Sequence, residues 1–439
     1  MKNVFHFCCV IAVSMACIAC LPPSSRAETA IPLLGGFDTE RIASVYPPID
    51  DEASGELAKL IYRLGKVDPS SIATIAAKPS DNVNLGDAWQ ASGTITKISI
   101  IKVPNRLHEF LELTELQLIV AEQDDQEIRI VTAEFPRRAK AGDKFAGPGV
   151  VIEKNDSGNT TVIAASRIKW FPSSPKNVGW KLLSEAGLDV GLIAAANSRN
   201  RKPLTGEDGD AFYCMLSAAH RIQSIATPDA VQLAPVDLLQ SPQDFGGQWI
   251  QMELETAQIT RISVTEPTRQ NQLQSNHYFQ IDAMGDLKNV VIKIESPDPD
   301  GPPVTFENRY PVSLVVRELP DFLRQKIRAR EGGDAVTSDV RVMIAVDGFF
   351  YRLWSYSTDF MKQHGGGNQF GPLVVAARIH NREPTNDDPA GVGAIGWIAA
   401  IAVLLGILAI WAWGRRTAAV DRELSQRRKD RQAEHIQLP

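Results

Sequence analysis

Cysteine is scarce in this sequence of 439 residues, and its distribution limits what it can do. Four of the five cysteines lie within the first 20 residues, in a segment that has the pattern of a signal peptide. If that segment is removed, Cys214 alone remains, which excludes an intramolecular disulfide and a four-cysteine zinc site. Cys214 lies in an apolar helical pattern, so we expect a buried structural thiol.

Common catalytic signatures are also lacking. No G-x-S-x-G elbow, H-E-x-x-H, P-loop or dinucleotide fingerprint occurs. His364-Gly365-Gly366-Gly367 is similar to the oxyanion loop of lipases, and Asp298-Pro299-Asp300-Gly301 to the start of a calcium loop. Neither has the additional residues that its chemistry needs, and the histidines do not pair at metal-ligand spacing. We therefore expect that the protein is not an enzyme and that it has neither a cofactor nor a metal site.

An excess of positive charge is absent as well. The chain has a formal net charge of −6, and the part between the two terminal segments described next is more acidic still. Nucleic acid is bound mainly through cationic contacts to phosphate. We therefore expect no nucleic-acid partner.

The N-terminus has the pattern of a secreted precursor. Lys2 precedes an apolar stretch, and Ser25-Arg26-Ala27 places small residues at a cleavage site, which predicts a signal peptide over residues 1–27. Because Cys17-Ile18-Ala19-Cys20 lies in the same stretch, a lipoprotein acylated on Cys20 is the alternative.

The C-terminal region has the pattern of a membrane span. Residues 390–414 contain no charged residue and are followed directly by Arg415 and Arg416. This predicts one transmembrane helix, with a basic cytosolic tail over residues 415–439. The expected location is the bacterial cytoplasmic (inner) membrane with the body on the periplasmic side, so one expected partner is the membrane itself.

Hydrophobic periodicity organises the body between these ends. Period-two patterns rich in Val, Ile and Thr predict strands, and i, i+3, i+4 spacing predicts helices, for example at Leu57, Leu60 and Ile61. The expected segments are a flexible lead-in (28–50), a short helical segment (51–86), a β-barrel unit (87–172), a helical linker (173–235) and a second β-barrel unit with an insertion (236–385).

The two barrel units repeat one another. Residues 94–99 (TITKIS) match residues 258–263 (QITRIS), and residues 163–168 (IAASRI) match residues 374–379 (VVAARI). The helical residues 59–65 also line up with residues 181–187. Agreement in order predicts a duplicated unit, with extra residues in the second copy that include a helical stretch around residues 320–330.

The resulting fold class is α+β and mainly β. We predict two related small antiparallel β-barrel units with short helical segments, plus one C-terminal transmembrane helix. Five or so strands per unit, opening on a glycine-bearing strand, resemble the OB-fold barrels, which host many unrelated functions. Residues 180–216, with Leu188-Asp189-Val190-Gly191-Leu192 and Asp210-Ala211-Phe212-Tyr213, resemble an uncharacterised membrane-anchored protein family of planctomycete-type bacteria.

An aromatic strand is the main candidate for recognition. In the segment 349–356, alternation places Phe350, Arg352, Trp354 and Tyr356 on one face and the intervening residues on the other. One face must enter the core, and the four residues form a candidate ligand or partner face. Burial of both faces under an inserted helix is the alternative.

We therefore expect a non-catalytic, membrane-anchored extracytoplasmic protein that acts as a protein-interaction or envelope-assembly module, with a protein partner. A small-molecule or glycan binding module that uses strand 349–356 is the alternative, and an enzyme is the third. An interaction module predicts an exposed apolar or strand-edge patch, whereas a binding module for small molecules predicts a concave aromatic pocket. The sequence leaves the partner, the ligand and the oligomeric state open.

Overall fold

The structure, a computed structural model, describes residues 28–76, 83–124, 126–155, 160–296, 303–327, 336–364 and 366–382. Within these ranges no helix is both long and apolar enough to span a membrane. The segments predicted as signal peptide (1–27), membrane helix (390–414) and basic tail (415–439) lie outside the described residues. The predicted extracytoplasmic location therefore stays a prediction.

The predicted fold class is wrong in two respects. No helix in the described ranges corresponds to its transmembrane helix, and its barrels are not antiparallel throughout. Strands β3 (Gln126–Glu134) and β5 (Thr160–Arg167) pair in parallel, as do β12 (Arg309–Val316) and β15 (Gln369–Asn381). The reason is geometric, because an odd number of strands that alternate in direction cannot close without one parallel pair. The fold is mixed α/β and mainly β.

Helices come first among the described residues. Residues 28–50, predicted as a flexible lead-in, instead form η1 (Ile31–Leu33) and α2 (Thr39–Ala43) and bury Leu34 and Ile42 completely. Helix α3 (Asp51–Leu64) begins where the Asp50 carboxylate accepts hydrogen bonds from the backbone amides of Glu52 and Ala53, and α4 (Pro69–Ile75) follows it.

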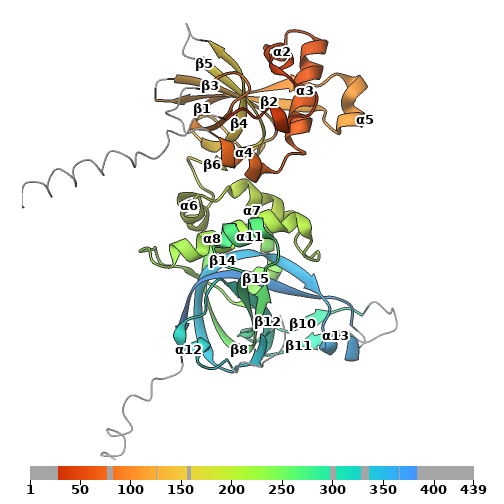
Figure 1. Cartoon of the computed structure of the whole chain (residues 1–439). Helices are drawn as coiled ribbons and strands as arrows, with labels where there is room; N and C mark the ends of the chain where they lie inside the picture. Colours follow the sequence, from red (N-terminus) through yellow and green to blue (C-terminus); the bar gives the residue numbers. More distant parts are fainter. Residues whose placement is uncertain are drawn as a thin grey trace, which may run out of the picture. The chain divides into compact units, whose positions relative to one another are not determined.

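Residues 88–171 build the first barrel (Figure 1). Five strands follow the order β1-β2-β3-β5-β4, the pairing of β1 with β4 closes the barrel, and β6 adds to β4. This order is compatible with an OB-like barrel. Its elements are β1 (Ala88–Lys102), η2 (Asn105–Leu107), α5 (His108–Leu111), β2 (Glu115–Gln123), β3, β4 (Lys144–Asn155), β5 and β6 (Lys169–Phe171).

A second group of helices leads into the second barrel. These are α6 (Val178–Glu185), α7 (Val190–Asn197), η3 (Gly206–Asp208) and α8 (Gly209–Ile222). After β7 (Val231–Gln232), two short helices follow, α9 (Pro235–Gln240) and α10 (Pro242–Phe245).

The second barrel has the strand order of the first. It runs β8-β9-β12-β15-β14 and closes by the pairing of β14 with β8, while β13 and β7 add to β8. Strands β10 and β11 form a separate two-stranded sheet. Its elements are β8 (Trp249–Ser263), α11 (Pro267–Leu273), β9 (His277–Asp286), β10 (Ile292–Ile294), β11 (Val304–Phe306), β12, α12 (Asp321–Arg324), β13 (Val336–Asp339), β14 (Met343–Tyr356), α13 (Asp359–Gln363) and β15.

Bulges mark equivalent positions in the two barrels. The opening strands β1 and β8 are both 15 residues long, and the register shifts at Thr96 in β1 and at Ala257 in β8. Thr96 therefore corresponds to Ala257 in the structure. The sequence match predicts Thr260 as its counterpart, and this prediction is wrong. Each closing strand also faces a bulge in its neighbour. The bulge in β4 lies opposite residues 162–163 of β5, and the bulge in β14 lies opposite residues 373–374 of β15. These positions agree with the sequence match.

One helix covers the outside of each barrel at equivalent strands. Helix α3 packs against β3 and β5, and α8 packs against β12 and β15. Both helices are 14 residues long. The counterpart of α3 is therefore α8, whereas the sequence match pointed to residues 181–187, which lie in α6 and beyond it.

The extra residues of the second copy are spread over three connections. Strand β3 begins at Gln126, directly after β2 ends at Gln123, but β9 and β12 are joined by the β10–β11 hairpin. The connection from β12 to β14 adds α12 and β13, and the one from β14 to β15 adds α13. The predicted helical stretch around residues 320–330 thus accounts for only part of the insertion.

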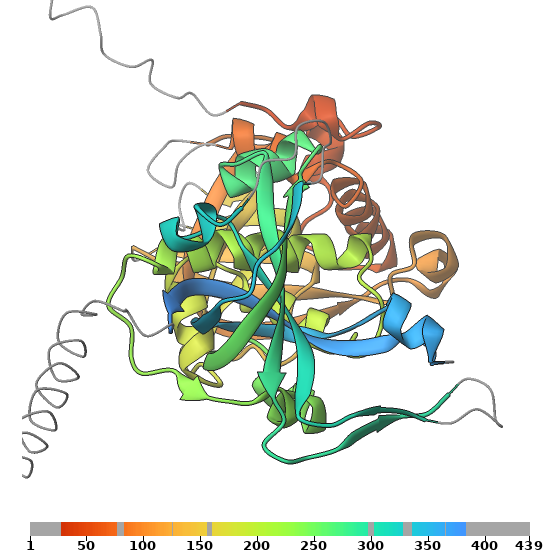
Figure 2. The same ribbon diagram turned by 90° about the horizontal axis from the view of Figure 1, so that it is seen from below.

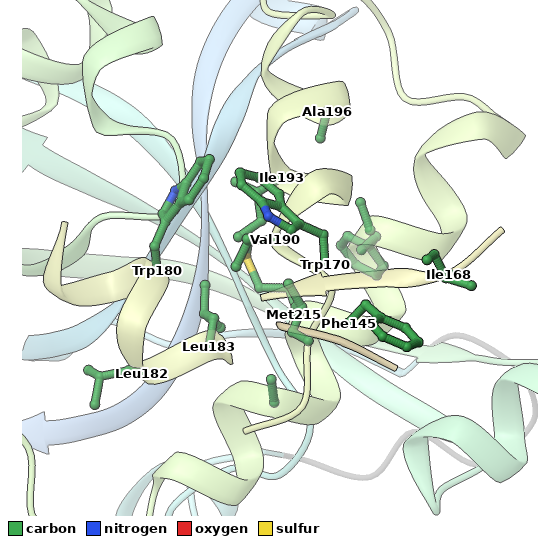
Figure 3. Packing of buried hydrophobic residues seen from close by; sticks show 14 of the residues in the cluster. Phe145, Ile168, Trp170, Trp180, Leu182, Leu183, Val190, Ile193, Ala196 and Met215 are labelled. Carbon is green, nitrogen blue, oxygen red and sulfur yellow. The ribbon is translucent and has the colours of Figure 1, made fainter. Parts of the chain in front are cut away.

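A large hydrophobic cluster joins the inside of the first barrel to the helices that cover the second. Phe145 and Ile168 belong to it, as do Trp170 of β6 and Trp180 of α6, whose rings meet edge to face with centroids 6.2 Å apart (Figure 3). The inside of the second barrel is a separate cluster.

Candidate functional site

A bulge decides where the predicted aromatic strand sends its side chains. In β14, Phe350 pairs with Val374 and Arg352 with Leu373, so Tyr351 is an extra residue in the ladder. The alternation therefore changes phase at this point. Phe350 and Leu353 both point into the second barrel, and Phe349 and Tyr351 pack under the helices outside it. The four predicted residues do not share one face.

The four residues differ in exposure as well. Phe350 and Arg352 have no exposed surface. Trp354 and Tyr356 are half-buried and stack on each other, with ring centroids 4.5 Å apart. Burial raises the pKa of Tyr356, and Gly371 lies against its ring. Only the last two residues of the predicted set have surface that a ligand could reach.

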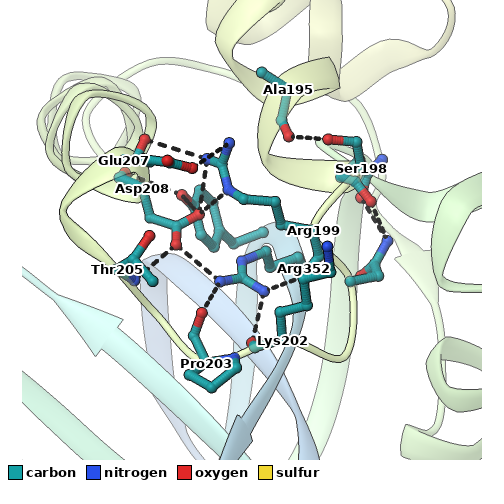
Figure 4. Close-up of polar contacts among 12 residues, drawn as sticks. Ala195, Ser198, Arg199, Lys202, Pro203, Thr205, Glu207, Asp208 and Arg352 are labelled. Atoms are coloured by element: carbon teal, nitrogen blue, oxygen red, sulfur yellow. Dashed lines mark hydrogen bonds and ion pairs between the residues drawn. The ribbon is translucent and has the colours of Figure 1, made fainter.

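Arg352 is the centre of a buried polar network (Figure 4). Its guanidinium donates to the Asp208 carboxylate at 2.9 Å and to the backbone carbonyls of Lys202 and Pro203, both at 2.9 Å. Asp208 also accepts two hydrogen bonds from Arg199 and one from the backbone amide of Thr205. The network fastens the segment before α8 to strand β14.

The network keeps Asp208 ionised. Burial by itself would raise the pKa of Asp208, but the hydrogen bonds from Thr205 and Arg199 and the charge of Arg352 outweigh it and lower the pKa. Every described partner belongs to the chain's own framework, and both side chains are buried, although the Nε atom of Arg352 has no partner among the described residues. The role of this ion pair is structural.

An exposed strand edge is found elsewhere, at the hairpin that joins β9 to β12. Strand β10 pairs with β11 on one side, and within the described ranges no strand pairs with its other side. Figure 2 shows this hairpin, in green and teal, extending away from the barrel. Unpaired edges of this kind offer backbone donors and acceptors to another chain.

A groove runs beside this edge. It has a volume of about 440 Å³ and is lined by the consecutive residues 290–295, by Val236, Leu239 and Gln240 of α9, and by Arg201, Tyr310, Leu353 and Phe370. Val291 is 51% exposed and Val290 is 38% exposed. Such exposed apolar side chains next to a free strand edge are typical of a protein-docking surface.

A hydrophobic cluster packed against the hairpin, which shares Tyr310 with the groove lining, explains why the hairpin keeps its shape. Phe306 and Tyr310 meet with ring centroids 4.9 Å apart, and together with Val304 and Met361 they form a small core of their own. The hydroxyl of Tyr310 donates to the backbone carbonyl of Phe370 at 2.5 Å. The free edge is therefore held on a packed support.

Charged side chains lie at the groove as well. Arg201 donates to the backbone carbonyl of Leu239 at 3.3 Å, and Lys293 and Glu295 lie on the hairpin itself. Two positive groups and one negative group favour a partner segment that carries an acidic residue. We refer to residues 290–295 and the lining described above as the β10 groove.

The other sequence candidates have ordinary surroundings. Burial raises the pKa of the Cys214 thiol, which argues against a reactive thiolate. His364 hydrogen bonds to the backbone carbonyl of Phe360, and the Asp298–Gly301 segment lies outside the described residues. In the described part of the chain, no group of three or more His, Cys, Asp or Glu side chains is arranged to hold a metal ion.

Sequence reasoning missed the β10 groove, although its strand was visible. The clustered β-branched residues of the segment 290–295 predict a strand, but they do not indicate that this strand lies outside the barrel. The available signal was the length of the connection, since the first copy joins β2 to β3 without any such hairpin.

Comparisons with known proteins add little. Neither a family model nor a curated protein matches this chain. A replication protein A heterotrimer bound to single-stranded DNA matches over 76% of this chain and 72% of that chain, at 8% identity and a TM-score of 0.17. An aspartyl-tRNA synthetase from Entamoeba histolytica matches over 50% of each chain, at 8% identity and a TM-score of 0.15. At such low TM-scores these likenesses carry no argument, and the resemblance to a planctomycete-type family stays a prediction.

Proposed function

We propose that this chain is a non-catalytic protein-interaction module that binds an extended segment of a partner protein along β10. The observation that carries the proposal is the free, apolar edge of a strand that is held on its own packed support. An added strand gains backbone hydrogen bonds from the edge, and the adjoining groove selects its side chains.

The chemistry of the groove defines the segment that it accepts. Strand alternation sends every second side chain of a bound segment toward the groove, where Val290, Val291 and Leu239 offer apolar surface. Arg201 and Lys293 favour an acidic side chain next to these apolar ones. The proposed partner segment is therefore extended, with alternating apolar residues and one acidic residue.

The alternative, a small-molecule or glycan site on strand 349–356, has weaker support. Two of its four residues, Phe350 and Arg352, are completely buried. The stacked pair of Trp354 and Tyr356 is half-buried, and neither residue lines the β10 groove.

A substitution on the hairpin tests the proposal. Peptides selected from a displayed library for binding to the wild-type protein should bind Val291→Lys about tenfold more weakly or worse, because apolar contact is lost and a charge enters the edge. Binding would be measured by fluorescence anisotropy with labelled peptides. Ile225→Lys is the matched control, since Ile225 is 54% exposed, close to the 51% of Val291.

Hydrogen exchange gives a second readout that depends on the backbone alone. Strand addition should slow exchange of the edge-facing amides in residues 290–295 when the peptide is bound, because those amides gain hydrogen-bond partners. Peptides that bind Val291→Lys and the wild type equally well, without slower exchange in this segment, would rule the proposal out.

A further inference from the structure

The mouth of the second barrel holds a second cavity, at the opposite end of β9 from the β10 hairpin. Its volume is about 520 Å³. It is lined by the end of β8, the residues between α11 and β9, the start of β9, the segment that follows β12, and the end of α12 with Ile327 further on; the described lining is Arg261, Gln274, Ser275, His277, Phe279, Arg317, Glu318, Leu319, Arg324 and Ile327. The mouth of a barrel is a common place for a small-molecule site.

The cavity is positive although the chain is acidic. Three arginines line it, against Glu318 as the one acid among the described lining residues. Glu318 is 3.5 Å from Arg317 and is itself 53% exposed, so it offsets only part of this charge. In a chain of net charge −6, this concentration of arginine selects for negatively charged ligands.

Backbone carbonyls hold two of the arginines in place, while Asp321 and Glu318 offset part of the charge of Arg324 and Arg317. Arg317 donates to the carbonyl of Gln274 at 3.0 Å, and Arg324 donates to the carbonyl of Leu319 at 2.9 Å. Arg261 lies 3.3 Å from the Nδ1 atom of His277. Burial and the charge of Arg261 lower the pKa of His277, which disfavours a positive charge on this ring.

Two of the guanidinium groups have unused donors. The Nε atoms of Arg261 and Arg317 are buried, and neither has a hydrogen-bond acceptor among the residues that the structure describes. Buried donors of this kind are costly unless something accepts from them. The planar guanidinium matches the oxygens of a carboxylate or a phosphate, which accept two hydrogen bonds side by side.

Apolar side chains complete the cavity. Phe279 lies opposite Arg261 in the β8–β9 ladder and meets the His277 ring edge to face at 5.3 Å. Leu319 and Ile327 add aliphatic surface. A ligand with an apolar body and one anionic group therefore fits this lining better than a bare ion does.

We propose that the mouth of the second barrel binds a small organic anion, in which a carboxylate or phosphate group sits on an apolar body. The anionic group meets Arg261 and Arg317, and the apolar body lies against Phe279 and Leu319. This inference does not depend on the β10 groove, whose lining is entirely different.

The test uses the full chain and simple probes. Phenyl phosphate and benzoate separate the two anionic groups, inorganic phosphate lacks the apolar body, and benzyl alcohol lacks the charge. Isothermal titration calorimetry should show saturable binding of phenyl phosphate or benzoate, weaker binding of inorganic phosphate and none of benzyl alcohol. Equal binding of benzyl alcohol, or no saturable binding of either aromatic anion, would overturn the proposal.

Variants place the binding in this cavity. Arg261→Met and Arg317→Met should each weaken binding of the aromatic anion by about tenfold or more, because each removes a charged hydrogen-bond donor. Arg309→Met, at a side chain that is 57% exposed on the same barrel and outside this lining, should leave affinity unchanged. Arg317→Lys keeps the positive charge and serves as a control for a folding defect at this position. It should bind the aromatic anion more tightly than Arg317→Met does. Equal losses of affinity in all of the variants would indicate diffuse charge attraction and would contradict the assignment of the site to this cavity.

Discussion

Replacing Asp208 by asparagine is expected to lower the free energy of unfolding by about 3–5 kcal/mol, because it removes one partner of a buried ion pair. Asp208 and Arg352 have side-chain exposures of 3% and 0%, and their closest atoms are 2.9 Å apart. Asparagine has nearly the same shape, so the loss isolates the charge. Arg352 would then remain buried without a counter-ion.

The measurement is urea denaturation of the purified protein, followed by tryptophan fluorescence. Asp210→Asn serves as the control two residues further on, because Asp210 is 56% exposed in its ion pair with Arg269. Surface pairs of this kind contribute about 0–1 kcal/mol. A loss in Asp208→Asn no larger than that in Asp210→Asn would contradict the structural role of the network.

The same ion pair predicts how the difference in unfolding free energy between the wild type and Asp208→Asn depends on pH. The folded state lowers the pKa of Asp208 from its ordinary value of 3.8, so the carboxylate stabilises the fold fully above that ordinary value. As the pH falls through the lowered pKa of the folded state, the stabilisation is lost. The gap in unfolding free energy between the wild type and Asp208→Asn should therefore be constant near neutral pH and should shrink in acid.

The sequence predicted those features of the fold that depend on local pattern. The spacing of Leu57, Leu60 and Ile61 predicted a helix, and all three residues are buried in α3. The match between residues 163–168 and 374–379 agrees with the strand pairing of the two barrels. In both cases a repeating local pattern carries the information, since burial of one face imposes a period on the sequence.

Features that depend on pairing between distant segments were not predictable in this way. The bulge at Tyr351 arises from the register of β14 against β15, and no period in residues 349–356 signals it. Strict alternation therefore placed Arg352 on the candidate ligand or partner face, whereas in the structure it is buried against Asp208. A lone arginine in an aromatic strand was a sound signal of a special environment, but its buried partner is 144 residues away in the chain.

The cavity at the barrel mouth was invisible for a related reason. Arg261, His277 and Arg317 come from the end of one strand, the start of the next and the segment after a third. Each looks like an ordinary polar residue at the end of a strand. Only the closure of the barrel brings these three residues together. The net charge of the whole chain is negative and therefore gives no indication of this local positive site.

Close backbone packing gives the second large effect that we expect. Gly179 lies near the start of α6, and a Cβ atom at this position would be 2.0 Å from the backbone oxygen of Gly247 and 2.5 Å from the backbone nitrogen of Trp249. Backbone atoms cannot swing aside as a flexible side chain can. Alanine at this position must therefore push α6 away from the start of β8.

Gly179→Ala is accordingly expected to lower the free energy of unfolding by about 3 kcal/mol or more, at the upper end of the range for overpacking. The loss opposes the helix propensity of alanine, which by itself would stabilise α6 by about 1 kcal/mol. It also disturbs the hydrogen bond, 2.9 Å long, from the Trp180 indole to the backbone carbonyl of Gly246.

Gly206→Ala separates this contact from any general effect of replacing glycine. No atom lies within 4 Å of a Cβ atom built at Gly206, so this variant should be neutral or slightly more stable in the same urea titration. A Gly179→Ala protein as stable as Gly206→Ala would show that α6 does not pack on β8 through its backbone. A large loss of unfolding free energy that is confined to Gly179→Ala would instead identify this contact as a main attachment of the helices to the second barrel. The neighbouring Trp180 side chain belongs to the hydrophobic cluster that also fills the first barrel.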